Sequence, residues 1–493
     1  MNIQRIKRGV WLGIGITLCL AAPAVGQQVD RSKPPALGPV QPLSLPPITR
    51  HTLSNGLPVL VMEKHQVPLV QVNLLVKSGS AMDPADKPGL ASMTADMLEE
   101  GAGTRGALAL ADAIDFLGAE IDVTAEQHRI GVALHTPVAR IDSALALMAD
   151  VALRPTFPAD ELERLRRERL TDLAQEHDEP RAVARVLFMH SVFGDAHPYG
   201  RMTSGTEASL RAFTPDDFRR FHQAYFRPDN AALVVVGDVT ADQILPKLEA
   251  AFGKWSAGGS ASPPPRWSEA SQVTGRQVFL ADKPGAAQTE VIIGRVGVPR
   301  STPDYYALTV LNTALGGSFT SRLNQNLREE KQYTYGAFSQ FQYEKLAGPF
   351  FASAAVQTAV TDKALVEFMK ELTRIRSGLT DDELVRAKNY VALRFPGRFQ
   401  SIGTIARQLG DLVIYDLPLD YYNNYVQRIQ AVTAADVKRV ANQYIDPNKM
   451  VIVLVGDKAK IEAGVRALKL GTIRTLTIDE VLGPAPVVTT SMR

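Results

Sequence analysis

The chain has few of the side chains that bind transition metals or form covalent cross-links. Its only cysteine is Cys19, and its eight histidines are spread so widely that no two lie three or four residues apart. No histidine follows His222 in the 493-residue chain. These scarcities exclude an internal disulfide framework and a pair of histidine ligands on one helical turn.

Long apolar runs are also missing, apart from one short run near the N-terminus. Arg5, Lys7 and Arg8 precede an apolar segment at residues 10–20, and the small residues of AAPAVGQQ follow it. A membrane span needs about 20 apolar residues, so the pattern predicts a secretory signal peptide over residues 1–26. Leu18 fits poorly before a lipidated Cys19. We therefore expect a secreted protein, in the periplasm of a Gram-negative bacterium, with no membrane span after cleavage.

An excess of charge of one sign is absent as well. The formal net charge of +2 falls by three, to −1, once Arg5, Lys7 and Arg8 are removed with the signal peptide. No basic patch is visible in the sequence, which argues against nucleic acid as a partner. The next segment, residues 27–48, contains RSKPPALGPVQPLSLPP, and so many prolines predict an extended arm.

An internal duplication organises the remaining sequence. Residues 214–238 align without gaps on residues 433–457 at an offset of 219, and nine of the 25 pairs are identical. Each copy begins with a threonine suited to cap a helix, continues as an amphipathic helix, turns at a proline and ends in an apolar strand followed by Gly-Asp. A strand that is apolar on both faces belongs in the middle of a covered sheet. We therefore expect Val234 and Val453 to occupy equivalent central strands.

The duplication divides the chain into two similar parts. We assign residues 49–254 to an N-terminal half, 255–275 to a linker that includes the Gly-, Ser- and Pro-rich WSAGGSASPPPRW, 276–470 to a C-terminal half and 471–493 to a tail. Helices alternate with strands, but strand–strand hairpins also occur, as in GLPVLVMEKHQVPLVQVNLLVKSGS. This combination favours an α+β fold of two homologous α/β sandwiches over a doubly wound sheet. In the second half we expect one helix from Pro303 to about Glu330.

Five motifs in a fixed order point to a known family. They are GLASMTADMLEEG (residues 89–101), HPYGR (197–201), RPDNAALVVVGD (227–238), LGGSFTSRLNQNLREEKQYTYG (315–336) and the duplication itself. Together they resemble the pitrilysin/insulinase family of zinc peptidases, which includes mitochondrial processing peptidases and the core proteins of respiratory complex III. The resemblance covers roughly residues 49–470 and implies the inverted-zincin fold.

The metal-binding motif of that family is degenerate in this chain. Active members carry His-x-x-Glu-His on the first helix and a glutamate ligand on a later helix. The resemblance places Ser92 and Asp96 at the two histidine positions, Ala95 at the catalytic glutamate, and Asp172 at or near the third ligand. These side chains lack the nitrogen donors that zinc prefers, so we expect no metal and no cofactor in this chain. A hard cation on Asp96 and Asp172 is disfavoured relative to a solvated or hydrogen-bonded carboxylate pair.

The first helix keeps an apolar face although it has lost its ligands. Leu90, Met93, Met97 and Leu98 recur at helical spacing. We expect the helix to pack through these side chains and to act as scaffold.

A second motif of the family is intact. In active relatives an arginine, and a tyrosine seven residues later, reach toward the zinc site from the C-terminal half, and LREEKQYTYG supplies Arg328 and Tyr335 at this spacing. Both side chains can donate hydrogen bonds to a developing oxyanion. The alternative is structural: Arg328 pairs with a glutamate at the helix end and Tyr335 packs in the sheet.

The resemblance therefore implies a subunit that completes another chain's active site. We expect a heterodimer or larger complex with a homologous subunit that carries His-x-x-Glu-His and zinc, and substrates that are unfolded or short peptides. This chain alone is not expected to cleave them. Two alternatives remain open: a purely structural subunit like the core proteins, or a module that binds peptides without cleaving them.

Overall fold

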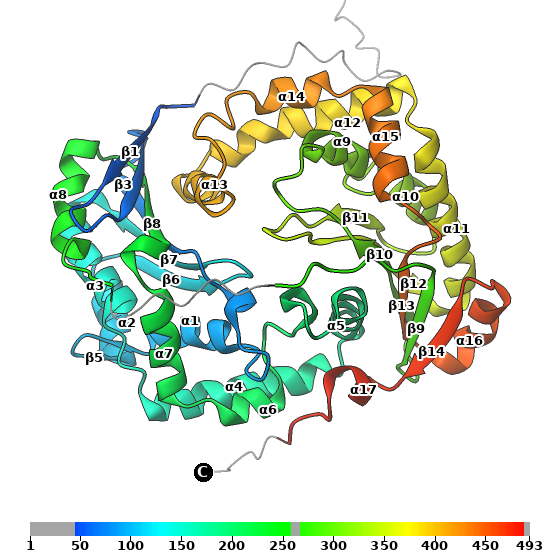
Figure 1. The fold of residues 1–493 in the computed structure, drawn as a ribbon, viewed down its shortest axis with the longest axis horizontal. Helices are drawn as coiled ribbons and strands as arrows, with labels where there is room; N and C mark the ends of the chain where they lie inside the picture. The colour runs from blue at the N-terminus through cyan, green and yellow to red at the C-terminus, as the bar shows by residue number, and fades with distance from the viewer. Residues whose placement is uncertain (1–44, 258–266, 488–493) are drawn as a thin grey trace, which may run out of the picture. The chain divides into compact units, whose positions relative to one another are not determined.

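Two mixed β-sheets, each with helices packed against it, form the core of the protein (Figure 1). The computed structural model describes residues 45–257 and 267–487. The predicted signal peptide and most of the proline-rich arm lie outside these residues, as does the centre of the predicted linker. No helix in the two described ranges has both the length and the apolar character needed to cross a bilayer.

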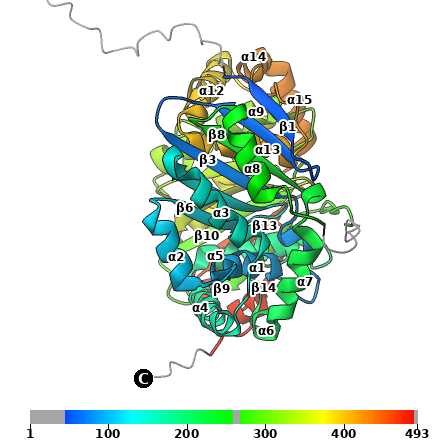
Figure 2. The same ribbon diagram turned by 90° about the vertical axis from the view of Figure 1, so that its left-hand side faces the viewer.

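The N-terminal half builds the first sheet, with strand order β1-β2-β8-β3-β7-β6. Its elements are β1 (Ile48–Thr52), β2 (Pro58–Glu63), β3 (Leu69–Val76), η1 (Ser80–Met82), α1 (Leu90–Glu99), β4 (Gly101–Ala102), β5 (Arg105–Gly106), α2 (Ala107–Phe116), β6 (Glu120–Ala125), β7 (Ile130–Pro137), η2 (Val138–Arg140), α3 (Ile141–Leu153), α4 (Ala159–Glu176), α5 (Pro180–Phe193), η3 (Pro198–Gly200), α6 (Glu207–Ala212), α7 (Pro215–Tyr225), η4 (Pro228–Asn230), β8 (Ala231–Gly237) and α8 (Ala241–Phe252). Helices α1 and α3 lie against β6 and β7, and α8 packs beside α3 (Figure 2).

The C-terminal half builds the second sheet, with strand order β11-β12-β10-β13-β9-β14. Its elements are β9 (Gln277–Asp282), β10 (Gln288–Val296), α9 (Tyr305–Leu315), α10 (Arg322–Asn324), η5 (Gln325–Glu330), β11 (Phe338–Phe341), β12 (Pro349–Gln357), η6 (Thr358–Val360), α11 (Thr361–Arg374), η7 (Ile375–Ser377), α12 (Asp381–Arg394), η8 (Phe395–Phe399), α13 (Ile402–Ile414), α14 (Tyr425–Ala431), α15 (Ala434–Tyr444), β13 (Val451–Gly456), α16 (Lys458–Ala467), β14 (Thr472–Leu476) and α17 (Ile478–Leu482). Strand β14, from the predicted tail, pairs in parallel with β9.

The two sheets share one pairing scheme, which confirms the predicted α+β fold of two homologous halves. Strand β8 runs parallel to β2 and antiparallel to β3, and β13 runs parallel to β9 and antiparallel to β10. Val234 lies on β8 and Val453 on β13, and both side chains are fully buried. Their equivalence is therefore confirmed. The edge strands next to β2 and β9 differ, because β1 is antiparallel to β2 whereas β14 is parallel to β9.

The duplicated helices also begin in the same way. Asp217 accepts a hydrogen bond from the backbone N–H of Thr214 at 2.9 Å, and Asp436 accepts one from Thr433 at 3.0 Å. Both are capping boxes, which satisfy N–H groups that the first helical turn leaves free. The predicted threonine caps at the starts of these helices are thus confirmed in both copies.

Each sheet receives one helix from the other half of the chain. Helix α5 packs on β10 and β13 of the second sheet, and α13 packs on β3 and β8 of the first (Figure 1). The helices start 222 residues apart, at Pro180 and Ile402, so they are counterparts within the duplication. Val183 and Phe188 of α5 share an apolar cluster with Val453 of β13. The exchange joins the two halves into one packed unit.

A glycine permits the close approach of α5 to the second sheet. A Cβ atom at Gly294 on β10 would lie 2.2 Å from the backbone O of Phe350 and 2.7 Å from Cζ of Phe188. Contacts this short are forbidden, so the packing of α5 requires glycine here.

The predicted helix from Pro303 to Glu330 is wrong in its extent. Helix α9 ends at Leu315, and the chain becomes helical again only at Arg322. Gly316 explains the break, because a Cβ atom there would lie 2.2 Å from the backbone N of Ser339 on β11. The Gly-Gly pair ends the helix and lets the following loop pack on the strand.

Candidate functional site

Helix α1, which carries the degenerate motif, is fixed at its N-terminus by a buried carboxylate. Oδ2 of Asp83 accepts a hydrogen bond from the backbone N–H of Gly89, and Oδ1 accepts one from Ala91, both at 2.8 Å. Burial raises the pKa of Asp83 to about 7, because a charged carboxylate is poorly solvated there. The predicted apolar face is confirmed, since the side chains that it comprises are at most 5% exposed: Leu90, Met93, Met97 and Leu98.

An arginine contacts the two positions that the resemblance assigns to histidine ligands. Nε and Nη2 of Arg169, on α4, donate to Oδ2 of Asp96 at 3.1 and 2.5 Å, and Nη2 also donates to Oγ of Ser92 at 3.3 Å. The side chains of Arg169 and Asp96 are 29% and 28% exposed. One guanidinium therefore joins both positions on α1 to α4.

A second ion pair lies one helical turn further along the same interface. Nη2 of Arg164 lies 2.6 Å from Oε2 of Glu100. Asp96 lies on α1 and Glu100 directly follows the helix, and their ion pairs with Arg169 and Arg164 show that both face α4. Glu99, between them, has a pKa raised to about 7, first by burial and then by the nearby carboxylates of Asp122 and Asp96.

The remaining positions of the motif have no catalytic group. Ala95 is 1% exposed and contributes only a buried methyl group at the position that the resemblance assigns to the general base. Asp172 is exposed and forms no hydrogen bond with Ser92 or Asp96 within the described residues. Arg169, one turn earlier on α4, contacts them instead. Sequence reasoning missed Arg169, although it lies three residues from Asp172 and can share its helix face.

These residues do not fit a zinc ion. Zinc requires imidazole, thiolate or carboxylate donors in a tetrahedral set, whereas the contacts here are a hydroxyl, one carboxylate oxygen and a cationic guanidinium. In residues 45–257 and 267–487, no group of three or more His, Cys, Asp or Glu side chains could hold a metal ion. A guanidinium cannot lose its charge in a protein, so its presence opposes binding of any cation.

Arg328 and Tyr335 lie in a segment with two unusual backbone conformations. Arg328 belongs to η5, a π-helical turn, and Gln332 between the two residues has a left-handed φ of +58°. The side chain of Asn326 holds η5 in place by donating to Glu371 at 2.9 Å. Both conformations are rare for such residues and are often found at functional sites.

Arg328 has two local partners and Tyr335 has none among the described residues. Nε of Arg328 lies 3.3 Å from Oε1 of Glu329, and its guanidinium lies 4.6 Å from the ring centre of Phe319. Tyr335 is 90% exposed. The residue before it, Thr334, forms a β-bridge with Val356. Arg328 thus has the glutamate contact of the structural alternative, but Tyr335 does not pack in the sheet, and the two side chains do not contact each other.

The HPYGR motif forms a buried connection between the halves. The hydroxyl of Tyr199 hydrogen-bonds to Nε2 of His128 at 2.5 Å and accepts from the backbone N–H of Leu346 at 3.1 Å. Burial lowers the pKa of His128 to about 4, so the imidazole is neutral at pH 7. The motif therefore has a structural role here.

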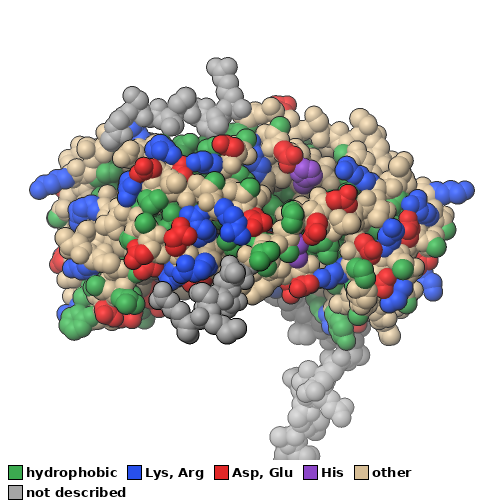
Figure 3. All heavy atoms as spheres, turned by 90° about the horizontal axis from the view of Figure 1, so that it is seen from below, with side chains coloured by type: hydrophobic (Ala, Val, Ile, Leu, Met, Phe, Trp, Pro, Cys, Tyr) green, Lys and Arg blue, Asp and Glu red, His purple; other side chains and the backbone are tan. Residues whose placement is uncertain are grey.

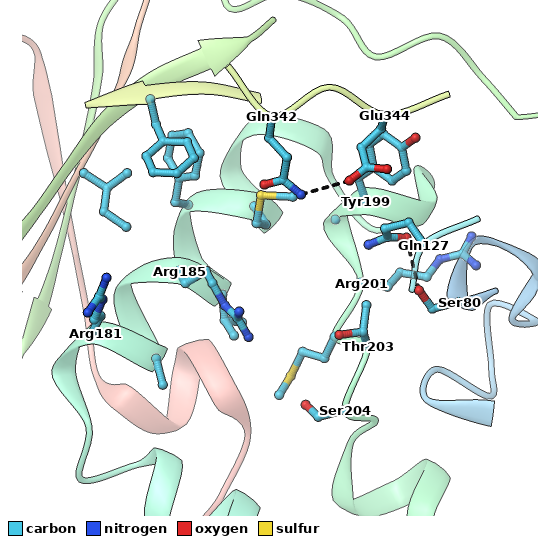
Figure 4. A pocket seen from close by; sticks show the side chains of 18 of the residues that line it. Ser80, Gln127, Arg181, Arg185, Tyr199, Arg201, Thr203, Ser204, Gln342 and Glu344 are labelled. Atoms are coloured by element: carbon cyan, nitrogen blue, oxygen red, sulfur yellow. Dashed lines mark hydrogen bonds between the residues drawn. The ribbon is translucent and has the colours of Figure 1, made fainter. Parts of the chain in front are cut away.

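A cavity of about 550 Å³ lies beside this connection, between α5 and the second sheet (Figure 4). Gln342 and Glu344 line one wall, and Nε2 of Gln342 donates to Oε1 of Glu344 at 3.1 Å. Arg181 and Arg185 of α5 line the opposite side. On the outer surface seen in Figure 3, basic and acidic side chains are interspersed, so no single charge dominates that face.

The chain is similar in sequence to proteins of one known family. Two family models match: "Insulinase (Peptidase family M16)" over residues 58–207 and "Peptidase M16 inactive domain" over residues 212–391. An uncharacterized zinc protease of Mycobacterium leprae is 30% identical over 346 residues, which are 70% of this chain and 76% of that protein. A protein of Helicobacter pylori named "Non-peptidase homolog YmxG" is 23% identical over 82% of this chain and 92% of its own length.

Solved structures agree with these matches. The crystal structure of a peptidase M16 inactive domain from Pseudomonas fluorescens has a TM-score of 0.78 and 27% identity, and the match covers 83% of this chain and 98% of that one. A protease from Helicobacter pylori has a TM-score of 0.78 at 22% identity, over 83% and 100% of the two chains, and this likeness concerns the fold alone.

Proposed function

The chain belongs to the insulinase family, peptidase family M16, and we propose that it is the zinc-free subunit of a two-chain peptidase. In this proposal a homologous partner carries His-x-x-Glu-His and zinc, and this chain contributes Arg328 and Tyr335 to the partner's site. The substrates are unfolded or short peptides. The apolar segment at residues 10–20, which precedes the described residues, supports the further proposal that the complex works in the periplasm.

The observation that carries the proposal is the presentation of Tyr335. Its phenol is 90% exposed and follows directly on the β-bridge of Thr334 with Val356, so it is accessible to a ligand as a hydrogen-bond donor. The segment from Arg328 to Tyr335 contains the end of the π-helical turn and the left-handed Gln332. Such conformations are retained where the surrounding structure enforces them, which supports a functional role for the segment.

The chemistry divides between the two chains. Zinc in the partner, when bound, supplies an activated water for attack on the peptide carbonyl. This chain's guanidinium and phenol orient that carbonyl and stabilise the oxyanion that develops on its oxygen. A zinc ion in this chain is unfavourable, since Arg169 places a fixed positive charge against Ser92 and Asp96.

A second candidate is a subunit that binds peptides or supports assembly without cleavage. It is favoured by the name of the Helicobacter pylori relative, a "Non-peptidase homolog". The two candidates differ in whether a partner's turnover depends on this chain.

Titration of this chain into a zinc-bearing homologue from the same genome distinguishes them. We expect cleavage of an unfolded fluorogenic peptide to rise with added chain and to saturate at a fixed stoichiometry. A complex that forms on size-exclusion chromatography while the partner's cleavage rate stays unchanged would favour the structural role. The chain alone is expected to cleave nothing, before or after zinc is added.

A further inference from the structure

Two arginines on α5 face the cavity without a direct counter-charge. Arg181 and Arg185 lie four residues apart, so their side chains share one helix face, and both line the cavity (Figure 4). In the part of the chain that the structure describes, neither guanidinium lies within 4 Å of a carboxylate oxygen. Two adjacent cations in a concave site attract an anionic group.

The carboxylates that feel the charge of this pair do not touch it. Glu290 is close enough to feel the charge of Arg181, and Glu176 that of Arg185, yet neither forms an ion pair with it. Burial raises the pKa of both glutamates. Glu176 itself lines the cavity, as do Glu126 and Glu344, and burial raises the pKa of Glu344 as well. The arginine pair therefore keeps its capacity to bind an external anion.

The opposite wall is suited to an extended peptide. Phe338, Gln340 and Gln342 alternate along β11 and beyond its end, so all three line the cavity from the same face of the strand. Strand β11 ends the second sheet, and no strand pairs with its outer side among the described residues. The edge of such a strand can pair with an added peptide strand.

The rest of the lining is mixed: polar side chains such as Ser80, Gln127 and Thr203 lie beside an apolar patch. Ile292 on β10 and Phe351 on β12 face α5, where Phe188 also borders the cavity. Ligand pockets of about 300–1,000 Å³ that combine apolar walls with a few charged groups bind specific ligands. The cavity, at about 550 Å³, has this size and carries an apolar patch next to its charged groups.

We propose that this cavity binds a peptide through a carboxylate held by Arg181 and Arg185, with the adjoining residue packed against Ile292 and Phe351. The carboxylate is the C-terminus of the peptide or an Asp or Glu side chain. Arginine suits this role because its planar guanidinium can bind a carboxylate through two parallel hydrogen bonds. The inference rests on the proposed function for its peptide ligand, and it adds a preference for peptides with an anionic group.

The test is equilibrium binding of fluorescent peptides to the isolated chain, without a partner. One peptide sequence is made in four forms: with Asp and Glu or with Asn and Gln in their place, each with a free or an amidated C-terminus. We expect Arg181→Gln with Arg185→Gln to weaken binding of the carboxylate-bearing forms by about 10–100-fold, as expected for the loss of charge-assisted hydrogen bonds. The fully neutral form should bind the variant and the wild type equally.

Controls separate this effect from general loss of charge. Arg140→Gln with Arg167→Gln removes the same charge from exposed positions that do not line the cavity, and should change no affinity. Arg181→Lys with Arg185→Lys keeps the charge but loses the planar fork, so it should restore binding only in part. Circular dichroism and thermal melting establish that each variant is folded.

Each result decides the inference. A loss confined to free C-termini, or to peptides with Asp and Glu, supports it and identifies the source of the carboxylate. Equal binding of all four peptides, an equal loss for all four, or no binding by the wild type contradicts it. Failure here leaves the proposed function intact if this chain still activates a partner, because that test depends on Arg328 and Tyr335. If the partner is not activated but carboxylate peptides bind, only the non-cleaving role survives.

Discussion

Arg169 and Asp96 face each other across the interface of α1 and α4, with Nε and Nη2 of the guanidinium 3.1 and 2.5 Å from a single carboxylate oxygen. Asp96 lies where active relatives are expected to carry a metal-ligating histidine. In this chain the guanidinium of Arg169 supplies a positive charge where the resemblance implies a zinc ion in active relatives. The ion pair joins α1 to α4 without a bound metal.

The first prediction concerns the barrier to metal binding. The wild-type chain should hold no stoichiometric zinc, and Ser92→His with Asp96→His should not restore it, because Arg169 still points at both positions. Adding Arg169→Glu should restore zinc, since it removes the cation and supplies a third donor. Zinc per chain, measured by atomic emission after dialysis, checks this. Equal zinc in the double and triple variants would show that Arg169 is not the barrier.

The second prediction concerns the stability that the same arginine provides. Arg169→Met should lower the free energy of unfolding by about 1–3 kcal/mol, between the values for exposed and buried ion pairs, because both partners are half-buried. Arg167→Met, at an exposed position on the same helix, is the matched control and should change it by less than about 0.5 kcal/mol. Urea denaturation followed by circular dichroism measures both. Equal effects would mean that the ion pair contributes no stability.

The third prediction concerns pH. The pKa of Glu99 is raised from 4.5 to about 7 by burial and by Asp122 and Asp96, so the folded protein holds a proton that the unfolded chain releases at lower pH. Its contribution is fully present below about pH 4.5 and is lost as the pH rises through about 7. Glu99→Gln should therefore flatten the fall in stability between pH 5 and 8, by up to about 1.4 kcal/mol per pH unit. Identical pH profiles of the wild type and Glu99→Gln would rule out this titration.

The fourth prediction compares the two copies of the capping box. Asp217 is 3% exposed and also pairs with Lys87, and despite its burial its pKa is lowered to about 2 by Lys87 and Thr214. Asp436 occupies the equivalent place in a more exposed setting. Asp436→Ala should cost about 0.5–2 kcal/mol, as for other helix caps. Asp217→Ala should cost about 1–3 kcal/mol more, because it also leaves a buried pairing site empty. Thermal melting of the two variants tests this, and equal costs would contradict it.

The sequence was sufficient to predict the features that depend on local patterns. The threonine caps, the apolar strands β8 and β13 and their equivalence follow from periodicity and from the repeat at an offset of 219. The buried face of α1 follows from the spacing of Leu90, Met93 and Met97. These features depend on short sequence patterns or on the repeat itself, so they can be predicted without knowledge of tertiary contacts.

Features that depend on distant contacts could not be predicted. Arg169 lies 73 residues from Asp96, and only the packing of α4 on α1 brings them together. The packing of α5 and α13 on the sheet of the other half cannot be predicted from either helix, since an apolar face does not specify which sheet covers it. The break at Gly316 depends on the approach of Ser339, which comes later in the chain.

The central claim is that this chain supplies oxyanion-stabilising groups to a partner's zinc site. The most direct test is the turnover number of the reconstituted complex, at saturating peptide, with Tyr335→Phe or Arg328→Ala in this chain. Loss of one oxyanion donor lowers turnover by about 10²–10³-fold, and we expect this loss with assembly and zinc content unchanged. Tyr333→Phe, two residues earlier and half-buried, is the matched control and should leave turnover unchanged. Wild-type turnover in a complex that carries both Arg328→Ala and Tyr335→Phe would contradict the account.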